Sequence, residues 1–145
     1  MAEIQRSRTI GADVDEIWNK LADFGALSSW ADSVDHSCIL NSGPNGALVG
    51  TSRRVQLGRN VLVERIIEVD APVVLAYEIS GLPRRVRRVT NRWTVDTGLV
   101  TLTSLVEIGS RPGQRLAERV LCRVLARQSD ALLAGLANRL ENVRV

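Results

Sequence analysis

The sequence predicts an α+β domain in which one antiparallel sheet wraps around a long C-terminal helix. Three observations predict this class. Polarity alternates with a period of two over residues 33–109, the last 30 or so residues have a helical period, and the connections between the expected strands are too short for crossover helices. The chain has 145 residues, of which 45% are apolar and 24% charged, as in an ordinary globular domain. We therefore expect residues 1–145 to form a single domain.

The N-terminal part is expected to hold one strand and two short helices. Residues 3–10 alternate in polarity and predict a strand. Asp13 is a suitable N-cap for a following helix, with Glu16 three positions later. One face of that helix collects the apolar side chains Val14, Ile17, Trp18 and Leu21. A second short helix is expected over 25–30.

The remainder of the chain predicts six further strands and the long helix. Turn-forming sequences separate the strands, which are expected at 34–40, 47–57, 61–69, 74–80, 86–96 and 99–108. The helix follows Pro112 and ends near Asn142, so it would be roughly 45 Å long at about 1.5 Å per residue. Its apolar stripe consists of Leu121, Leu125, Leu132, Leu136 and Leu140.

Several classes of protein and site are excluded at this stage. No apolar run approaches the ~20 residues of a membrane-spanning helix, and the first residues lack a signal-peptide core, so we expect a cytoplasmic protein. Cys38 and Cys122 lie far apart and form no zinc-binding motif, and His36 is the single histidine. We therefore expect no metal site and no cofactor.

Turn geometry predicts which side chains share a sheet face. A two-residue turn at Gly58-Arg59 aligns Arg53 with Glu64, and the next hairpin places Glu64 near Ile79. This face is otherwise mostly apolar, so an inward ion pair would be a polar anchor in an apolar pocket. The alternative is an ordinary pair on the solvent side, because a shift of one residue turns both charges outward.

Three further side chains are candidates for the same face. Tyr77, between Leu75 and Ile79, is expected to be buried, either as a core residue or as a ligand contact or proton donor. The turn at Thr97-Gly98 predicts that Trp93 points inward and Arg92 outward. His36 alternates with apolar residues and is expected to point inward, as a core residue or in a pocket. It has no nucleophile or acid partner that would indicate a catalytic triad.

The stretch "GLPRRVRR" holds four arginines at the turn between the fifth and sixth strands. It could be a solvated loop, or a basic rim, Arg84–Arg88, that attracts an anionic ligand, an anionic lipid or an acidic carrier protein. Nucleic-acid binding is not expected, because the few aromatic residues are mostly placed for burial.

The order of elements, with the stretches "DEIWNKLADFGALSSWA", "GTSRRV", "VLVERIIEVDAPVVLAYEISGLP" and "RVTNRWTV", resembles the helix-grip superfamily of START-like and Bet v 1-like proteins (SRPBCC). Within it, the chain looks like the bacterial polyketide cyclase/dehydrase and lipid-transport branch. The resemblance implies a seven-stranded antiparallel sheet gripping the last helix around a cavity, with Trp30 near its floor. It also suggests Arg92 inward, against the hairpin pattern. The candidate ligand-binding residues are Trp30, His36, Arg53, Glu64, Tyr77, Ile79, Trp93, Leu132 and Leu136.

Three functions are compatible with these features. The first is a carrier or sensor of a small hydrophobic or amphipathic ligand such as a lipid, fatty acid or polyketide. The second is a polyketide aromatase/cyclase or dehydratase in which Tyr77, Glu64, Arg53 and His36 could move protons, although no catalytic motif matches. The third is a toxin–antitoxin or co-chaperone type of interaction module, which would need an exposed apolar patch that the sequence does not clearly show. A monomer and a homodimer are both possible.

Overall fold

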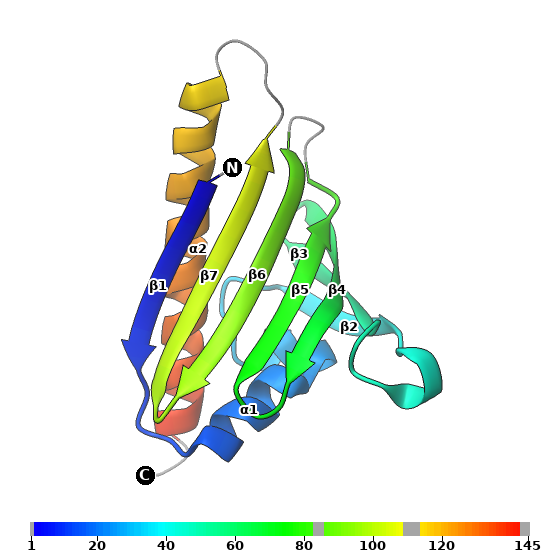
Figure 1. Ribbon diagram of the computed structural model, residues 1–145, viewed down its shortest axis with the longest axis vertical. Helices are drawn as coiled ribbons and strands as arrows, with labels where there is room; N and C mark the ends of the chain where they lie inside the picture. Colours follow the sequence, from blue (N-terminus) through cyan, green and yellow to red (C-terminus); the bar gives the residue numbers. More distant parts are fainter. Residues whose placement is uncertain (1, 83–85, 109–113, 143–145) are drawn as a thin grey trace.

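The computed structural model is built on one seven-stranded antiparallel sheet (Figure 1). The structure describes residues 2–82, 86–108 and 114–142. Within them the strands lie in the order β1-β7-β6-β5-β4-β3-β2. Their bounds are Ala2–Thr9 (β1), His36–Asn41 (β2), Ser52–Leu57 (β3), Asn60–Asp70 (β4), Val74–Ser80 (β5), Val86–Asp96 (β6) and Leu99–Ile108 (β7). The predicted α+β class and the antiparallel helix-grip arrangement are confirmed.

The hairpin registers agree with those predicted from the turns. Arg53 pairs with Glu64, and Glu64 pairs with Ile79. The turn at Gly58 has a φ of +61°, a left-handed conformation that glycine adopts without a steric penalty. The last hairpin pairs Trp93 with Leu102. Trp93 is buried, and Arg92 lies on the outer face, where its guanidinium contacts Glu68, so the hairpin pattern gave the correct orientation of both side chains.

Two short helices follow β1, as predicted: α1 (Val14–Ala22) and the 3-10 helix η1 (Phe24–Ser29). Asp13 is the N-cap of α1, although its side chain makes no capping hydrogen bond. The strand expected over 47–57 begins only at Ser52. A 3-10 turn, η2 (Pro44–Gly46), and the left-handed Gly50 take up the preceding residues and prevent extended pairing there.

The long helix α2 (Gln114–Asn142) lies against β1, β7 and α1 (Figure 1). Its two halves differ in burial. The C-terminal half contributes fully buried core residues such as Leu133 and Leu136, whereas Leu116, near the start, is 71% exposed. In the described residues, no helix combines the length and apolar character needed to cross a membrane. The core therefore closes around one end of α2, and the other end is left less covered.

Candidate functional site

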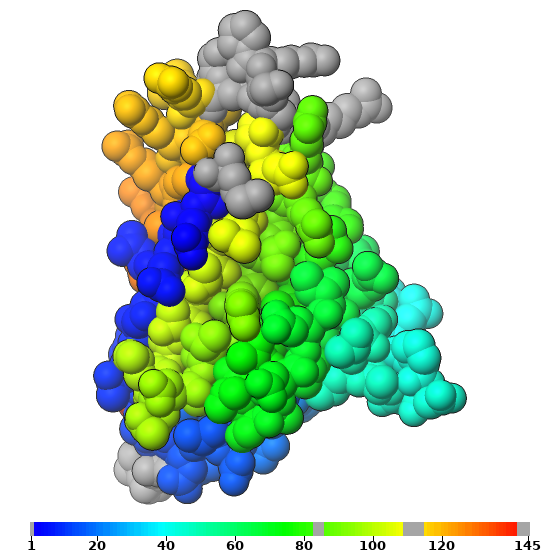
Figure 2. Space-filling model, viewed as in Figure 1, coloured from blue at the N-terminus to red at the C-terminus, as the bar shows by residue number. Residues whose placement is uncertain are grey.

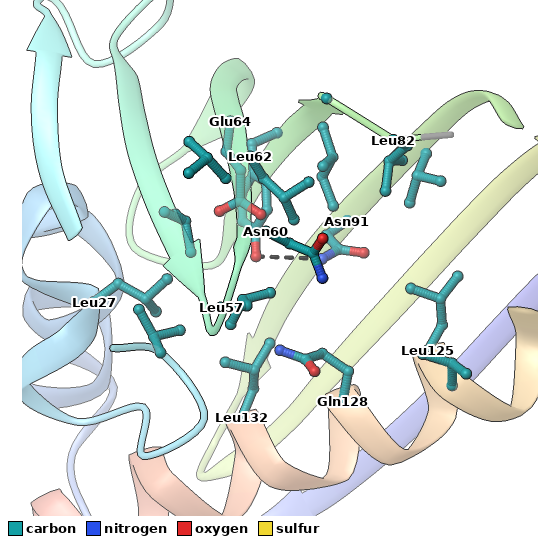
Figure 3. A pocket seen from close by; sticks show the side chains of 18 of the residues that line it. Leu27, Leu57, Asn60, Leu62, Glu64, Leu82, Asn91, Leu125, Gln128 and Leu132 are labelled. Atoms are coloured by element: carbon teal, nitrogen blue, oxygen red, sulfur yellow. Dashed lines mark hydrogen bonds between the residues drawn. The ribbon is translucent and has the colours of Figure 1, made fainter. Parts of the chain in front are cut away.

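A pocket of about 380 Å³ lies between α2 and strands β3–β6. Ligand-binding pockets are typically about 300–1,000 Å³ and mostly apolar. Figure 3 shows Leu27, Leu57 and Leu62 on one side of this pocket and Leu125 and Leu132 of α2 on the other. The polar residues in the lining are Arg59, Asn60, Glu64, Tyr77, Asn91 and Gln128. The pocket therefore combines an apolar wall with a small set of polar groups.

The predicted ion pair faces inward. Arg53 and Glu64 are 3% and 6% exposed, and both Nε and Nη2 of Arg53 contact the same carboxylate oxygen, Oε1, at 2.8 and 2.6 Å. Glu64 lines the pocket, whereas Arg53 lies behind it. No other described group donates a hydrogen bond to Glu64, so its second oxygen, Oε2, can accept one from a bound molecule.

Several contacts hold the Arg53 guanidinium in place. Its Nη1 donates to the Phe24 carbonyl oxygen at 2.9 Å, at the start of η1. The guanidinium carbon lies 3.7 Å from the centre of the Phe24 ring and 4.8 Å from that of Tyr77. Cation–π contacts of this kind stabilise a guanidinium that is removed from water. Arg53 is therefore a fixed positive charge that positions the Glu64 carboxylate at the pocket wall.

Tyr77 provides the second polar group of the pocket. Its Oη accepts hydrogen bonds from Asn91 Nδ2 and Trp93 Nε1, both at 3.3 Å. Burial, and then the nearby Glu64 carboxylate, raise the pKa of Tyr77, and Arg53 and the two hydrogen bonds only partly oppose this. The described residues offer its hydroxyl proton no acceptor. Tyr77 therefore remains protonated and can donate a hydrogen bond into the pocket.

A row of polar side chains crosses three strands at this level. Tyr77 of β5 pairs with Asn91 of β6, and Asn91 pairs with Ser104 of β7. Ser104 Oγ donates to Asn91 Oδ1 at 2.6 Å, which orients the Asn91 amide so that its nitrogen points to Tyr77. Figure 3 shows Asn91 and Glu64 directed into the same space from different strands. All three residues of the row are buried, so the row is fixed by its own hydrogen bonds.

The predicted site residues fall into three groups. Glu64, Tyr77, Ile79 and Leu132 line the pocket. The buried side chains Arg53 and Trp93 support it from behind through their bonds to Glu64 and Tyr77. Leu136 and Trp30 belong to the core, where the Trp30 ring meets that of Trp93 edge-on at 6.1 Å.

The inward orientation predicted for His36 is wrong. His36 is exposed on the edge strand β2 and does not line the pocket. It pairs with Gln56, whereas Ser37 pairs with the buried Val55 and so shares the pocket face. The prediction assumed that Val34 belonged to the same strand, but the Val34 backbone is part of a turn bonded to Ala31, so the alternation starts afresh after it.

The arginines after β5 are only partly described. Arg84 and Arg85 lie outside the described residues, so the proposed rim Arg84–Arg88 is not placed as a whole. Gly81 and Leu82, just before them, line the pocket. Arg88 is on β6 and pairs with Glu78 at 3.0 Å, so its charge is already matched.

Four polar residues of the lining were not among the predicted site residues, namely Arg59, Asn60, Asn91 and Gln128. For the last two, the sequence held a usable signal. Asn91 is two residues from Trp93 on the same strand, so the hairpin register that oriented Trp93 also orients Asn91 inward. Gln128 occupies the gap in the leucine stripe between Leu125 and Leu132. It stands on α2 opposite Asn60 across the pocket (Figure 3). Both could have been found from strand parity and helix periodicity.

Comparison with solved structures shows the same fold in several proteins. The aromatase/cyclase ZhuI from Streptomyces sp. R1128 superposes with a TM-score of 0.77 at 21% identity, covering 97% of this chain and 93% of that one. A START superfamily protein from Mycobacterium smegmatis superposes with a TM-score of 0.76 at 14% identity, covering 97% of this chain and 98% of that one. The di-domain aromatase/cyclase StfQ of the steffimycin pathway superposes with a TM-score of 0.78 at 14% identity, covering 98% of this chain and 51% of that one.

No protein with a curated description matches the sequence. The family model described as "Polyketide cyclase / dehydrase and lipid transport" matches residues 1–141, which is nearly the whole chain. The match agrees with the pocket between sheet and helix and with the solved structures of the same fold. The chain therefore belongs to the polyketide cyclase/dehydrase and lipid transport family.

Proposed function

We propose that this protein binds a small, largely apolar molecule with a neutral oxygen-bearing end, and acts as its carrier or sensor. The observation that carries the proposal is the pocket itself, whose lining is mostly apolar and whose buried polar groups are Glu64, Tyr77 and Asn91. Tyr77 offers a hydrogen-bond donor and Glu64 Oε2 an acceptor. A hydroxyl group, or a carbonyl beside one, satisfies both. Arg53 already neutralises Glu64, so a free carboxylate at this depth would have no unpaired positive partner.

The mouth of the pocket is more polar than its inner end and carries a positive charge. Arg59, at the turn between β3 and β4, lines the pocket and is exposed. Asn60 and Gln128 also line the pocket and face each other across it from β4 and α2 (Figure 3). An anionic group on the ligand would therefore be accommodated at the mouth and not at the Glu64 end.

Mass spectrometry of the native protein as purified is the first test, and a co-purifying apolar molecule is the expected result. Binding is then measured by displacement of anilinonaphthalene sulfonate with decanol and with decanoate. Leu62→Trp should abolish displacement because the larger side chain fills the pocket. Val63→Trp, on the opposite face of the same strand, is the matched control and should bind as wild type does. Equal binding by both tryptophan variants would contradict the pocket as the binding site.

A second candidate function is that of a polyketide aromatase/cyclase or dehydratase. The observation in its favour is that the Tyr77 hydroxyl and the Glu64 carboxylate line the same pocket, so one group can give a proton while the other accepts one. Turnover of a poly-β-keto thioester mimic, lost in Tyr77→Phe and in Glu64→Gln, would support it. If both variants still bind the mimic and wild type leaves it unchanged, the carrier function is retained and the enzyme is rejected.

A further inference from the structure

The first half of α2 exposes an apolar stripe that no other described element covers. Leu116, Val120 and Val124 are 71%, 56% and 55% exposed, the highest values among the large apolar side chains in the described residues. A four-residue spacing rotates each side chain by only about 40° from the last, so the three form one stripe. This is the exposed apolar patch that the sequence did not clearly show.

Four arginines run beside this stripe with the same spacing. Arg115, Arg119, Arg123 and Arg127 are all exposed. Within the described ranges none of them has a carboxylate within 4 Å. Some arginines on the outer face of the sheet differ, since Arg65, Arg88 and Arg92 are paired with glutamates. The positive charge of the first half of α2 is therefore unmatched within the described protein.

We propose that the first half of α2 docks on the surface of an anionic lipid bilayer. A helix with an apolar face beside a basic face lies in the plane of a membrane interface, with the apolar side chains among the upper acyl chains. The guanidinium groups can then contact lipid phosphates, which they bind in a bidentate manner. The side chains of the first turns of α2 stand at the surface of the molecule, shown in yellow to orange in Figure 2.

Lipid is favoured over an acidic protein because the most exposed apolar side chains stand next to the charges on one helix. Charge alone would suffice to attract an acidic protein, whereas Leu116 at 71% exposure is unfavourable in water unless an apolar phase receives it. Docking on a bilayer removes both mismatches with the same surface. Membrane docking does not require a ligand in the pocket, so this proposal is independent of the proposed function.

The stripe is continuous with the mouth of the pocket. Val124 and Leu121 line the pocket and also belong to the apolar surface at the start of α2. A docked helix therefore brings the mouth against the bilayer. If the proposed function is correct, an apolar ligand would pass between pocket and membrane without crossing water; this last step rests on that function.

The test is flotation of the purified protein with vesicles of phosphatidylcholine, with or without phosphatidylglycerol. Wild type should float only with phosphatidylglycerol, and less as salt is raised. Arg119→Gln/Arg123→Gln should weaken binding roughly 30-fold, taking the usual contribution of each basic residue at an anionic surface. Leu116→Gln/Val120→Gln should weaken it roughly tenfold or more while leaving the pocket lining intact.

A matched control separates docking from general attraction by the basic protein. Arg8→Gln/Arg139→Gln removes two exposed arginines elsewhere and gives the same net charge as Arg119→Gln/Arg123→Gln. It should float as wild type does. The proposal is overturned if wild type does not float, if this control loses as much binding as the helix variant, or if Leu116→Gln/Val120→Gln floats unchanged. Binding of an acidic protein through the stripe without vesicle binding would also overturn it.

Discussion

Replacing Glu64 by leucine should destabilise the protein more than replacing Arg53 by methionine, although each change removes the same ion pair. Glu64→Leu leaves the Arg53 guanidinium buried behind the pocket wall, 3% exposed and unable to lose its charge. Arg53→Met leaves Glu64 at the pocket wall, where water in the pocket can reach its carboxylate. The asymmetry follows from which partner lines the cavity.

The structure gives the size of the effect. Charges about 4 Å apart attract by about 4 kcal/mol at an effective dielectric constant near 20. Removing one partner of a buried pair costs about 3–5 kcal/mol, and Glu64→Leu should lie in this range. Arg53→Met should cost about 1–3 kcal/mol, which includes the loss of the donor to the Phe24 carbonyl. The double variant should lie within about 2 kcal/mol of wild type, because an apolar pair of similar volume replaces the ions.

Urea unfolding of the four proteins at neutral pH, followed by circular dichroism, measures these differences. The double-variant cycle gives the coupling between the two positions directly. If Glu64→Leu costs under about 1 kcal/mol, the guanidinium is not held as a buried charge. If the double variant is as unstable as Glu64→Leu, the cost comes from packing and the explanation by charge is wrong.

Three other measurements test the same structure. Tyr77 is the only tyrosine, so tyrosinate absorbance reports on it alone. Its raised pKa predicts that the folded protein is less ionised than an unfolded tyrosine near pH 10. Stability should then fall as the pH rises further, because the unfolded state releases the proton first. Absorbance appearing near pH 10 without unfolding would show an accessible hydroxyl. Gly135→Ala should destabilise by about 1–3 kcal/mol in thermal unfolding, because a Cβ there overlaps the Trp30 carbonyl oxygen. Leu136→Ala should lower the free energy of unfolding by about 2–5 kcal/mol, whereas Leu116→Ala should change it by no more than about 0.5 kcal/mol. Similar values for both would contradict the difference in burial between the two halves of α2.

The sheet could be predicted well because its information is local. A two-residue turn fixes the register of its hairpin, and the period of two then fixes every side chain on both strands. Gly58 alone was enough to place Arg53 opposite Glu64. This local information is missing where no tight turn precedes the strand. His36 begins β2 after an irregular segment, so nothing in its own sequence defined which face it would take.

Two features of the site depend on tertiary packing and so could not be derived from spacing. Whether the Arg53–Glu64 pair faced the core or water depended on where η1 packs, because the Phe24 carbonyl and ring provide the guanidinium with its inward partners. The spacing of the leucine stripe on α2 does not say how deeply each part of the helix is buried. The structure buries Leu133 and Leu136 in the core, whereas Leu116 and Val120 stay exposed, although Ile108 of β7 borders the same surface hollow.

The division of α2 also explains why a pocket exists at all. Where the helix packs against β1, β7 and α1, leucine side chains fill the interior, as Leu136 does. Toward its N-terminus the helix stands over β3–β6, and only part of the space is filled, by Leu125 and Gln128 from the helix and by the Tyr77–Asn91 row from the sheet. A row of buried hydrogen-bonding groups in place of a leucine layer reduces the apolar packing that the core could have gained. A bound molecule that accepts a hydrogen bond from the free Tyr77 hydroxyl would offset this loss, so the hydroxyl and the pocket together indicate a ligand.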